Sequence, residues 1–162
     1  MRDFTTAFAA ILASALMLAA AGCSQAPEED DSPEFAAMEY RQGLMHVQAW
    51  KLGVLRGMAE GAIDADADVF AEYAGDLAAA AGMLTEGFDG LAASDSETMA
   101  GSGAMPGIWD NWDDFVQKAA DLEAAAEEVA AAASTPGFSV GAESAAPLGP
   151  TCGGCHRVYR QQ

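Results

Sequence analysis

The stretch MPGIWDNWDDFVQKAADLEAAAEEVAAAA, residues 105–133, decides the fold class of this chain of 162 residues. Its apolar residues recur at alternating intervals of four and three: Ile108, Trp112, Phe115, Ala119, Leu122, Ala126 and Val129. That period places them on one face of an α-helix, as a long seam for packing against other helices. Pro136 and Gly137 are typical of the end of such a helix. We therefore predict one long helix between Pro106 and Pro136.

Two helices are predicted upstream of this seam. The first runs from Phe35 to about Glu60 without a proline, and one face carries Met38, Arg41, Met45, Ala49 and Leu52. The second lies in residues 62–84, with a stripe made of Phe70, Tyr73, Leu77, Ala80 and Leu84. Asp64 and Asp66 are expected to cap its start. Residues 86–107 are rich in glycine and serine and predict a loop.

A short last helix completes the predicted fold. Pro150 suits the first turn of a helix and is followed closely by the pentad CGGCH, residues 152–156. Residues 138–149 favour no regular structure. The chain shows no strand-like alternation of any length. We predict an all-α protein, an antiparallel four-helix bundle that spans residues 35–162.

The beginning of the chain indicates export. Residues 1–22 contain a short apolar run that ends in small residues, as in a secretory signal peptide. The sequence LAAAGC, residues 18–23, resembles the bacterial lipoprotein cleavage box, with Ala20 where leucine is usual. We expect cleavage before Cys23, lipidation of Cys23 and an acidic tether over residues 23–34; the alternative is ordinary cleavage nearby. The expected location is the periplasm, with contact to the membrane only through the lipid.

The charge of the chain excludes one class of partner. It carries 25 Asp and Glu residues against 7 Lys and Arg residues, a formal net charge of -18. Nucleic-acid binding needs a basic surface, so we do not expect it. No nucleophile constellation and no pair of catalytic carboxylates stands out in the sequence. We therefore predict that the protein is not an enzyme.

The pentad CGGCH admits three chemistries. A redox dithiol usually sits between a strand and a helix, and a structural zinc site needs four ligands. Covalent haem attachment needs two thiols and a histidine in this spacing. Because the chain is helical and exported, we predict one covalent haem c. Cys152 and Cys155 would form its thioethers, and His156 would be the proximal ligand of the iron.

Three stretches together resemble the cytochrome c′ family. They are YRQGLM at residues 40–45, the opening MPGIW of residues 105–133, and CGGCHRVYR at residues 152–160. The resemblance implies that Arg41 pairs with a haem propionate and that Met45 faces the open side of the iron. It also implies that Arg160, one helical turn beyond His156, holds a positive charge near the iron.

The family resemblance implies a function and leaves one alternative open. It predicts five-coordinate iron that binds nitric oxide, carbon monoxide or other small gases, with a possible redox role. The alternative is a six-coordinate electron carrier of the c-556 type with Met45 as the distal ligand. The family usually forms homodimers through the first two helices, and the apolar residues Leu44, Val54 and Leu55 lie outside the haem stripe. We predict a homodimer on this basis; the alternative is that these residues fill the core of the bundle. The sequence names no redox partner.

Two positions depart from the family pattern or fall outside its site. PLGP, residues 147–150, places two prolines where the family usually continues a helix, so the last helix is expected to be broken or short. His46 points about 100° away from Met45 on a regular helix. We expect His46 at the rim or surface.

Overall fold

The computed structural model describes residues 32–90 and 101–161. The predicted signal peptide, Cys23 and the tether up to residue 31 lie outside these ranges. The described residues form helices and no β-strand, apart from one isolated bridge. The helices are α2 (Pro33–Ala59), α3 (Ala67–Gly82), α5 (Gly107–Asp110), α6 (Trp112–Ala133) and α7 (Leu148–Tyr159). The predicted all-α fold is confirmed.

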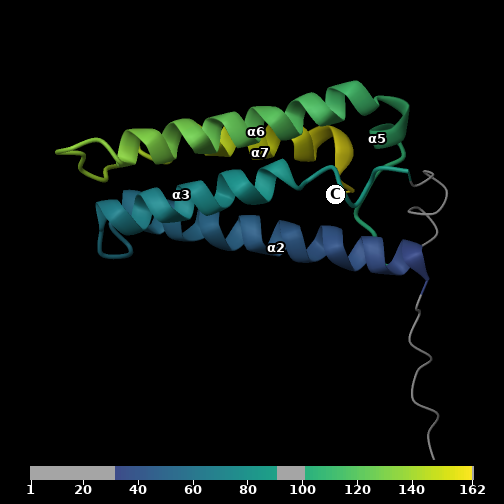
Figure 1. The fold of residues 1–162 in the computed structure, drawn as a ribbon, viewed down its shortest axis with the longest axis horizontal. Coiled ribbons are helices and arrows are strands. Elements are labelled where there is room, and N and C mark those ends of the chain that lie inside the picture. The colour runs from purple at the N-terminus through teal and green to yellow at the C-terminus, as the bar shows by residue number, and fades with distance from the viewer. Residues whose placement is uncertain (1–31, 91–100, 162) are drawn as a thin grey trace, which may run out of the picture. The chain divides into compact units, whose positions relative to one another are not determined.

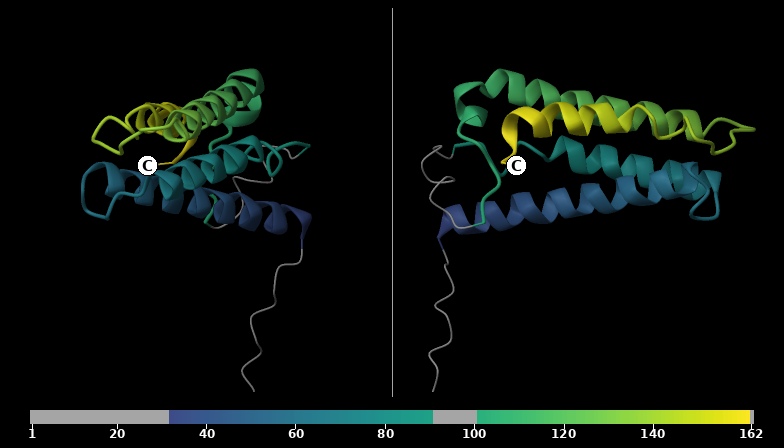
Figure 2. Two further views of the ribbon diagram at one scale, coloured as in Figure 1. Left: turned by 60° about the vertical axis from the view of Figure 1, so that its left-hand side comes forward. Right: turned by 180° about the vertical axis from the view of Figure 1, so that it is seen from behind.

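The long helices run antiparallel to their neighbours in the chain. Figures 1 and 2 show α2 and α3 as one hairpin and α6 and α7 as a second one laid against it. Within this arrangement α3 packs on both α2 and α6, and α7 packs on α6. The short connection at residues 60–66 favours α2 and α3 as antiparallel neighbours.

Side-chain caps define the starts of the first two helices. Ser32 Oγ accepts a hydrogen bond from the Phe35 amide at 3.2 Å, and Pro33 fills the first helical position. Asp66 caps α3, because its Oδ1 accepts from the amides of Asp68 and Val69 at 2.9 and 3.0 Å. Of the two predicted capping aspartates, Asp66 is therefore the N-cap.

The predicted long helix after Pro106 is interrupted, which corrects the sequence prediction. Asn111 has φ −130° and ψ 48°, outside the helical region, and separates α5 from α6. The Asn111 side chain donates to the Gly107 carbonyl oxygen at 3.0 Å, a local bond that competes with the helix. The periodicity continues across the break, so the spacing of apolar residues did not reveal it.

The prolines before the pentad begin a helix and do not break it. Pro147 is the N-cap residue of α7, and Pro150 lies in its first turn. Amides in the first turn have no partner within the helix, so a proline costs little there. At 12 residues α7 is short, as the sequence indicated.

The buried side chains form two clusters along the bundle. The Phe70 cluster contains Leu55, Met58, Ala59, Phe70, Ala74, Leu77, Ala78, Ala126, Val129, Ala133, Ala145 and Leu148. The Phe115 cluster contains Leu44, Ala80, Ala81, Leu84, Phe88, Ile108, Phe115, Ala119, Leu122 and Tyr159. The predicted seam of α6 contributes to both clusters, which confirms it as the core-facing side.

The buried face of α2 differs from the predicted stripe. Ala49 is exposed, whereas Leu44 and Gln48 are buried. Gln48 can be buried because its Nε2 donates to the Ala80 carbonyl oxygen at 3.1 Å. Leu55 is also fully buried. Two of the three apolar residues on which the dimer prediction rested thus fill the core of the bundle.

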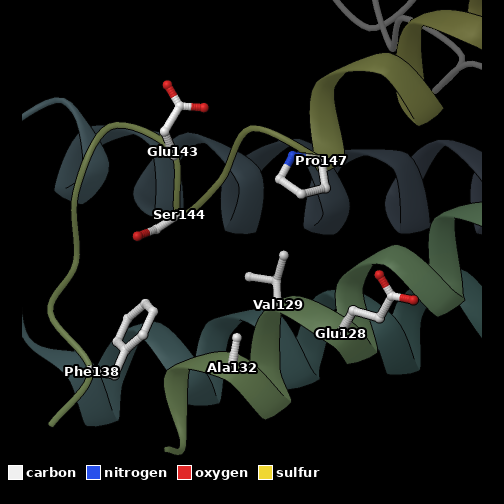
Figure 3. A pocket seen from close by; sticks show the side chains of 7 residues that line it. All are labelled: Glu128, Val129, Ala132, Phe138, Glu143, Ser144 and Pro147. Carbon is white, nitrogen blue, oxygen red and sulfur yellow. The ribbon is translucent and has the colours of Figure 1, made fainter.

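A pocket opens beside the Phe70 cluster. Figure 3 shows its lining on α6 and on the connection to α7: Glu128, Val129, Ala132, Phe138, Glu143, Ser144 and Pro147. None of the residues of the CGGCH pentad lines it. Among the residues the structure describes, no helix is both long enough and apolar enough to cross a membrane.

Candidate haem site

The two cysteines of α7 face the core side of the bundle. Cys152 and Cys155 are half-buried free thiols, three residues apart and therefore on one face of the helix. Both pack against the Phe115 cluster. Burial raises the pKa of each thiol, while the positive charges of Arg56 and Lys118 oppose the rise at Cys152 and Cys155 respectively. Burial thus favours the protonated thiol at both positions.

His156 follows on the same side of α7. It is half-buried and lies four residues after Cys152, one turn along the helix. Burial lowers the pKa of its imidazole, and the positive charge of Arg160 lowers it further. Both effects favour the neutral imidazole, the form that ligates a metal. Arg160 is exposed at the end of α7, close enough for its charge to act on His156.

The end of α7 is tied to the segment before α5. The Met105 amide donates to the Tyr159 carbonyl oxygen at 3.0 Å, and the Gln161 amide donates to the Gly103 carbonyl oxygen at 2.9 Å. These bonds flank the antiparallel bridge between Ala104 and Arg160. The backbone that carries Arg160 is thus held in place although its side chain is exposed.

Arg41 is buried on the α2 side, with only 6% of its surface exposed. Its Nη1 donates to the Gly87 carbonyl oxygen at 2.8 Å, and its guanidinium carbon lies 4.8 Å from the centroid of the Phe88 ring. Burial lowers its pKa. A Cβ on Gly87 would lie 2.6 Å from the Arg41 Cγ, so this close approach requires glycine. Arg41 is therefore not a surface arginine whose guanidinium extends into solvent at the rim of the site.

Met45 on α2 packs against the same apolar cluster as the two cysteines, the Phe115 cluster. Its side chain is half-buried. Phe88, which lies under the guanidinium of Arg41, belongs to that cluster as well. His46 is exposed, as predicted. The structure thus gathers Arg41, Met45 and the two cysteines around one cluster.

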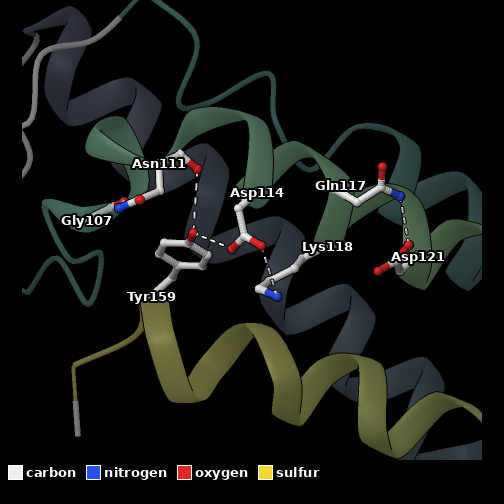
Figure 4. Close-up of polar contacts among 7 residues, drawn as sticks. All are labelled: Gly107, Asn111, Asp114, Gln117, Lys118, Asp121 and Tyr159. Atoms are coloured by element: carbon white, nitrogen blue, oxygen red, sulfur yellow. Dashed lines mark hydrogen bonds and ion pairs between the residues drawn. The ribbon is translucent and has the colours of Figure 1, made fainter.

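Sequence reasoning missed a polar anchor at this site. The Tyr159 hydroxyl donates to Asp114 Oδ2 at 2.6 Å, and Asp114 Oδ1 lies 3.4 Å from Lys118 Nζ (Figure 4). The spacing of Tyr159, three residues after His156 and four after Cys155, was the available signal. It places the tyrosine ring on the side of α7 that carries the pentad.

The donor set fits a covalent haem better than a protein-held metal ion. In the described ranges, no group of three or more histidine, cysteine or carboxylate side chains is arranged to hold a metal. The site offers two thiols one turn apart, an imidazole next to them, and an apolar cluster against which both thiols pack. That combination matches what haem attachment requires.

The sequence model of the family described as Cytochrome C′ matches residues 36–160. This chain belongs to the cytochrome c′ family. Proteins of the family bind one covalent c-type haem, and Cys152 and Cys155 fit its attachment. The cofactor of this chain is therefore one haem c.

Proteins similar in sequence to this chain include a cytochrome c-554 and a cytochrome c-556. Cytochrome c-554 of Cereibacter sphaeroides is 40% identical over 77% of this chain and 92% of its own length. Cytochrome c-556 of Agrobacterium tumefaciens is 36% identical over 76% of this chain and 95% of its own length.

Solved structures share the fold. Cytochrome c prime from Shewanella frigidimarina aligns with a TM-score of 0.69 at 29% identity, over 82% of this chain and 98% of that one. A nitric oxide complex of a cytochrome c prime variant from Alcaligenes xylosoxidans aligns with a TM-score of 0.67 over 83% of this chain and 99% of that one. At 23% identity, that second likeness concerns the fold alone.

Proposed function

We propose that this cytochrome c′ family member binds small neutral gases, chiefly nitric oxide, at a five-coordinate haem iron. One observation carries the proposal: Met45 packs half-buried against the same apolar cluster as Cys152 and Cys155. A thioether in that place fills the open side of the site with apolar surface. Such a side admits only small uncharged ligands.

The proposal assigns a role to each residue of the site. The haem supplies an iron that binds gases and exchanges an electron. Cys152 and Cys155 hold it covalently, and His156 offers its neutral imidazole as the proximal ligand. Arg41 offers a buried positive charge, which matches the charge of a haem propionate.

The ligand class follows from the polarity of the site. Met45 packs against the Phe115 cluster, whose members are aliphatic and aromatic side chains. An apolar site favours nitric oxide and carbon monoxide over oxygen, because bound oxygen needs a hydrogen-bond donor. The variant cytochrome c prime from Alcaligenes xylosoxidans, whose fold this chain shares, was solved with nitric oxide. We place Arg160 near the proximal side, where its charge would face the iron if the bond to His156 weakened. No enzymatic activity is part of this proposal.

A second function is favoured by the position of the Met45 thioether. A half-buried methionine that packs against the same cluster as the haem-binding cysteines can also ligate the iron and give a low-spin electron carrier. The relative named cytochrome c-556 belongs to the type for which we expect this arrangement. The two functions differ in one bond, that between the Met45 sulfur and the iron.

Visible spectra of the holoprotein separate the two functions. We expect high-spin spectra in both oxidation states, and a new spectrum when nitric oxide or carbon monoxide is added to the reduced protein. Met45→Ala should leave the iron high-spin and speed ligand binding. Met58→Ala, a buried methionine of the Phe70 cluster, is the control for general loss of packing. A low-spin spectrum that Met45→Ala alone converts to high-spin would establish the electron carrier instead.

We also propose that the mature protein is periplasmic and begins at a lipidated Cys23. The proposal rests on the apolar leader and on the run of small residues before Cys23. Two or more acyl chains give a stable anchor, where a single chain is marginal. Mass spectrometry of the mature N-terminus tests this. An unmodified amino terminus beyond Cys23 would overturn it.

A further inference from the structure

The C-terminal turn of α7 is anchored through one buried tyrosine. Tyr159 is only 4% exposed, and its ring meets the Phe115 ring edge-on with centroids 5.6 Å apart. Its hydroxyl donates to Asp114 Oδ2 at 2.6 Å, and the Asn111 carbonyl oxygen lies 3.5 Å away. Figure 4 shows Tyr159 reaching from α7 to the first turn of α6. Tyr159 therefore joins α7, the helix that carries the haem-binding residues, to α6.

Asp114 is held in the ionised form that makes this bond strong. The hydrogen bond from Tyr159 is the main cause that lowers the pKa of Asp114, and Lys118 lowers it further. Asp114 also stands in the first turn of α6, where the helix dipole favours a negative charge. On the other side of the bond, burial and Asp114 raise the pKa of Tyr159 to about 12. Around neutral pH the Tyr159 hydroxyl thus donates to an ionised carboxylate.

The rest of α7 gives the helix little intrinsic rigidity. It begins at Leu148 after an N-cap proline that offers no side-chain hydrogen bond, and it contains Gly149, Gly153 and Gly154. Glycine is a poor helix former, and a helix of 12 residues is marginal without tertiary contacts. The placement of His156, one turn before Tyr159, therefore depends on where the end of α7 is pinned.

We propose that Tyr159 and Asp114 are positioning residues for His156: their hydrogen bond sets how firmly the imidazole stays on the iron when a ligand binds opposite. The proposal rests on the proposed function for its gas ligand. It makes the α6–α7 anchor, and not the iron ligands alone, a determinant of the coordination state. Loss of the bond would loosen the end of α7, which the backbone bonds to residues 103 and 105 still hold, and His156 would leave the iron more readily.

The test uses the holoprotein and the variant Tyr159→Phe, which keeps the ring and removes the hydroxyl. We expect the ratio of nitric oxide complex without His156 to complex with His156 to rise by about tenfold, since a hydrogen bond to a charged group is worth that factor or more. The iron–histidine vibration of the reduced protein should shift to lower frequency. Asp114→Asn, which still offers an acceptor, should restore part of the wild-type ratio relative to Asp114→Ala.

A matched control exists on α2. The Tyr40 hydroxyl donates to Glu86 Oε2 at 2.7 Å, the same type of bond away from α7. Tyr40→Phe should leave both readouts at wild-type values. If Tyr159→Phe behaves like Tyr40→Phe in both readouts and in reduction potential, the inference is wrong.

The design separates this inference from the proposed function. Wild-type protein that binds no nitric oxide would refute the proposed function alone. The reduction potential would then decide the inference. A shift in Tyr159→Phe that is absent in Tyr40→Phe would support the anchor as a determinant of the His156 bond, and equal potentials would overturn it.

Discussion

Single residues at this site are explained by what buries them. Arg41 is a charge in an apolar stripe, a pattern that indicates an anionic partner but not its position. The structure adds that the guanidinium is covered by Phe88 and bonded to the Gly87 carbonyl oxygen. Gly87 has no side chain, and only for that reason can the arginine lie so close. A glycine far from the pentad thus belongs to the site.

Arg41→Leu should lower the free energy of unfolding by about 1–3 kcal/mol, because the Gly87 carbonyl oxygen loses its buried donor. Urea unfolding of the holoprotein measures the change. Gln42→Leu is the control, since Gln42 is exposed although it also bonds a carbonyl oxygen, that of Gly101. Its effect should stay within about 0.5 kcal/mol. Equal losses in both variants would contradict the buried role of Arg41.

At the scale of elements, local sequence signals determine where helices begin, whereas tertiary contacts stabilise the end of α7. Helix α3 begins where Asp66 can cap it, and α7 begins where prolines are tolerated. The end of α7 is held by contacts with other segments. Tyr159 donates a hydrogen bond to Asp114, and Arg160 forms a backbone bridge with Ala104. The end of the haem-bearing helix is therefore stabilised by α6 and by the segment before α5.

The anchor of α7 should make stability depend on pH in the alkaline range. The pKa of Tyr159 is raised from 10.0 to about 12, so the folded state holds its proton more tightly than the unfolded state. Its contribution is complete below pH 10 and is lost as the pH rises toward 12. Denaturant titrations at several alkaline pH values should show a smaller loss in Tyr159→Phe than in wild type. Parallel losses in the two proteins would contradict this.

On the scale of the whole molecule, one helix keeps an apolar side away from the core. Although Leu44 and Leu55 are buried, α2 leaves Tyr40, Val47 and Trp50 exposed by 39, 46 and 66%. Val47 lies seven residues after Tyr40 and three before Trp50, so Val47 shares one side of the helix with both. The dimer prediction stays a prediction, and these residues now replace the buried leucines as its basis.

Trp50→Glu should convert a homodimer into a monomer, because a charge at the centre of an apolar contact stays solvated only when the subunits separate. Light scattering over a range of protein concentrations measures the mass. Val116→Glu, at a valine of α6 exposed by 38%, is the matched control and should leave the mass unchanged. A wild-type protein that is monomeric at every concentration would refute the dimer.

The sequence by itself determined the bundle and the haem attachment. Both depend on short-range spacing: the four-three seam of residues 108–129 and the pentad of residues 152–156. The break at Asn111, the burial of Gln48 and the bond from Tyr159 to Asp114 were decided only by the tertiary structure. All three features depend on hydrogen bonds to particular partner atoms, which the periodicity of apolar residues does not encode. A seam tells which face of a helix is buried, but the rotation of α2 and the partner of a buried polar atom depend on which helix packs against it.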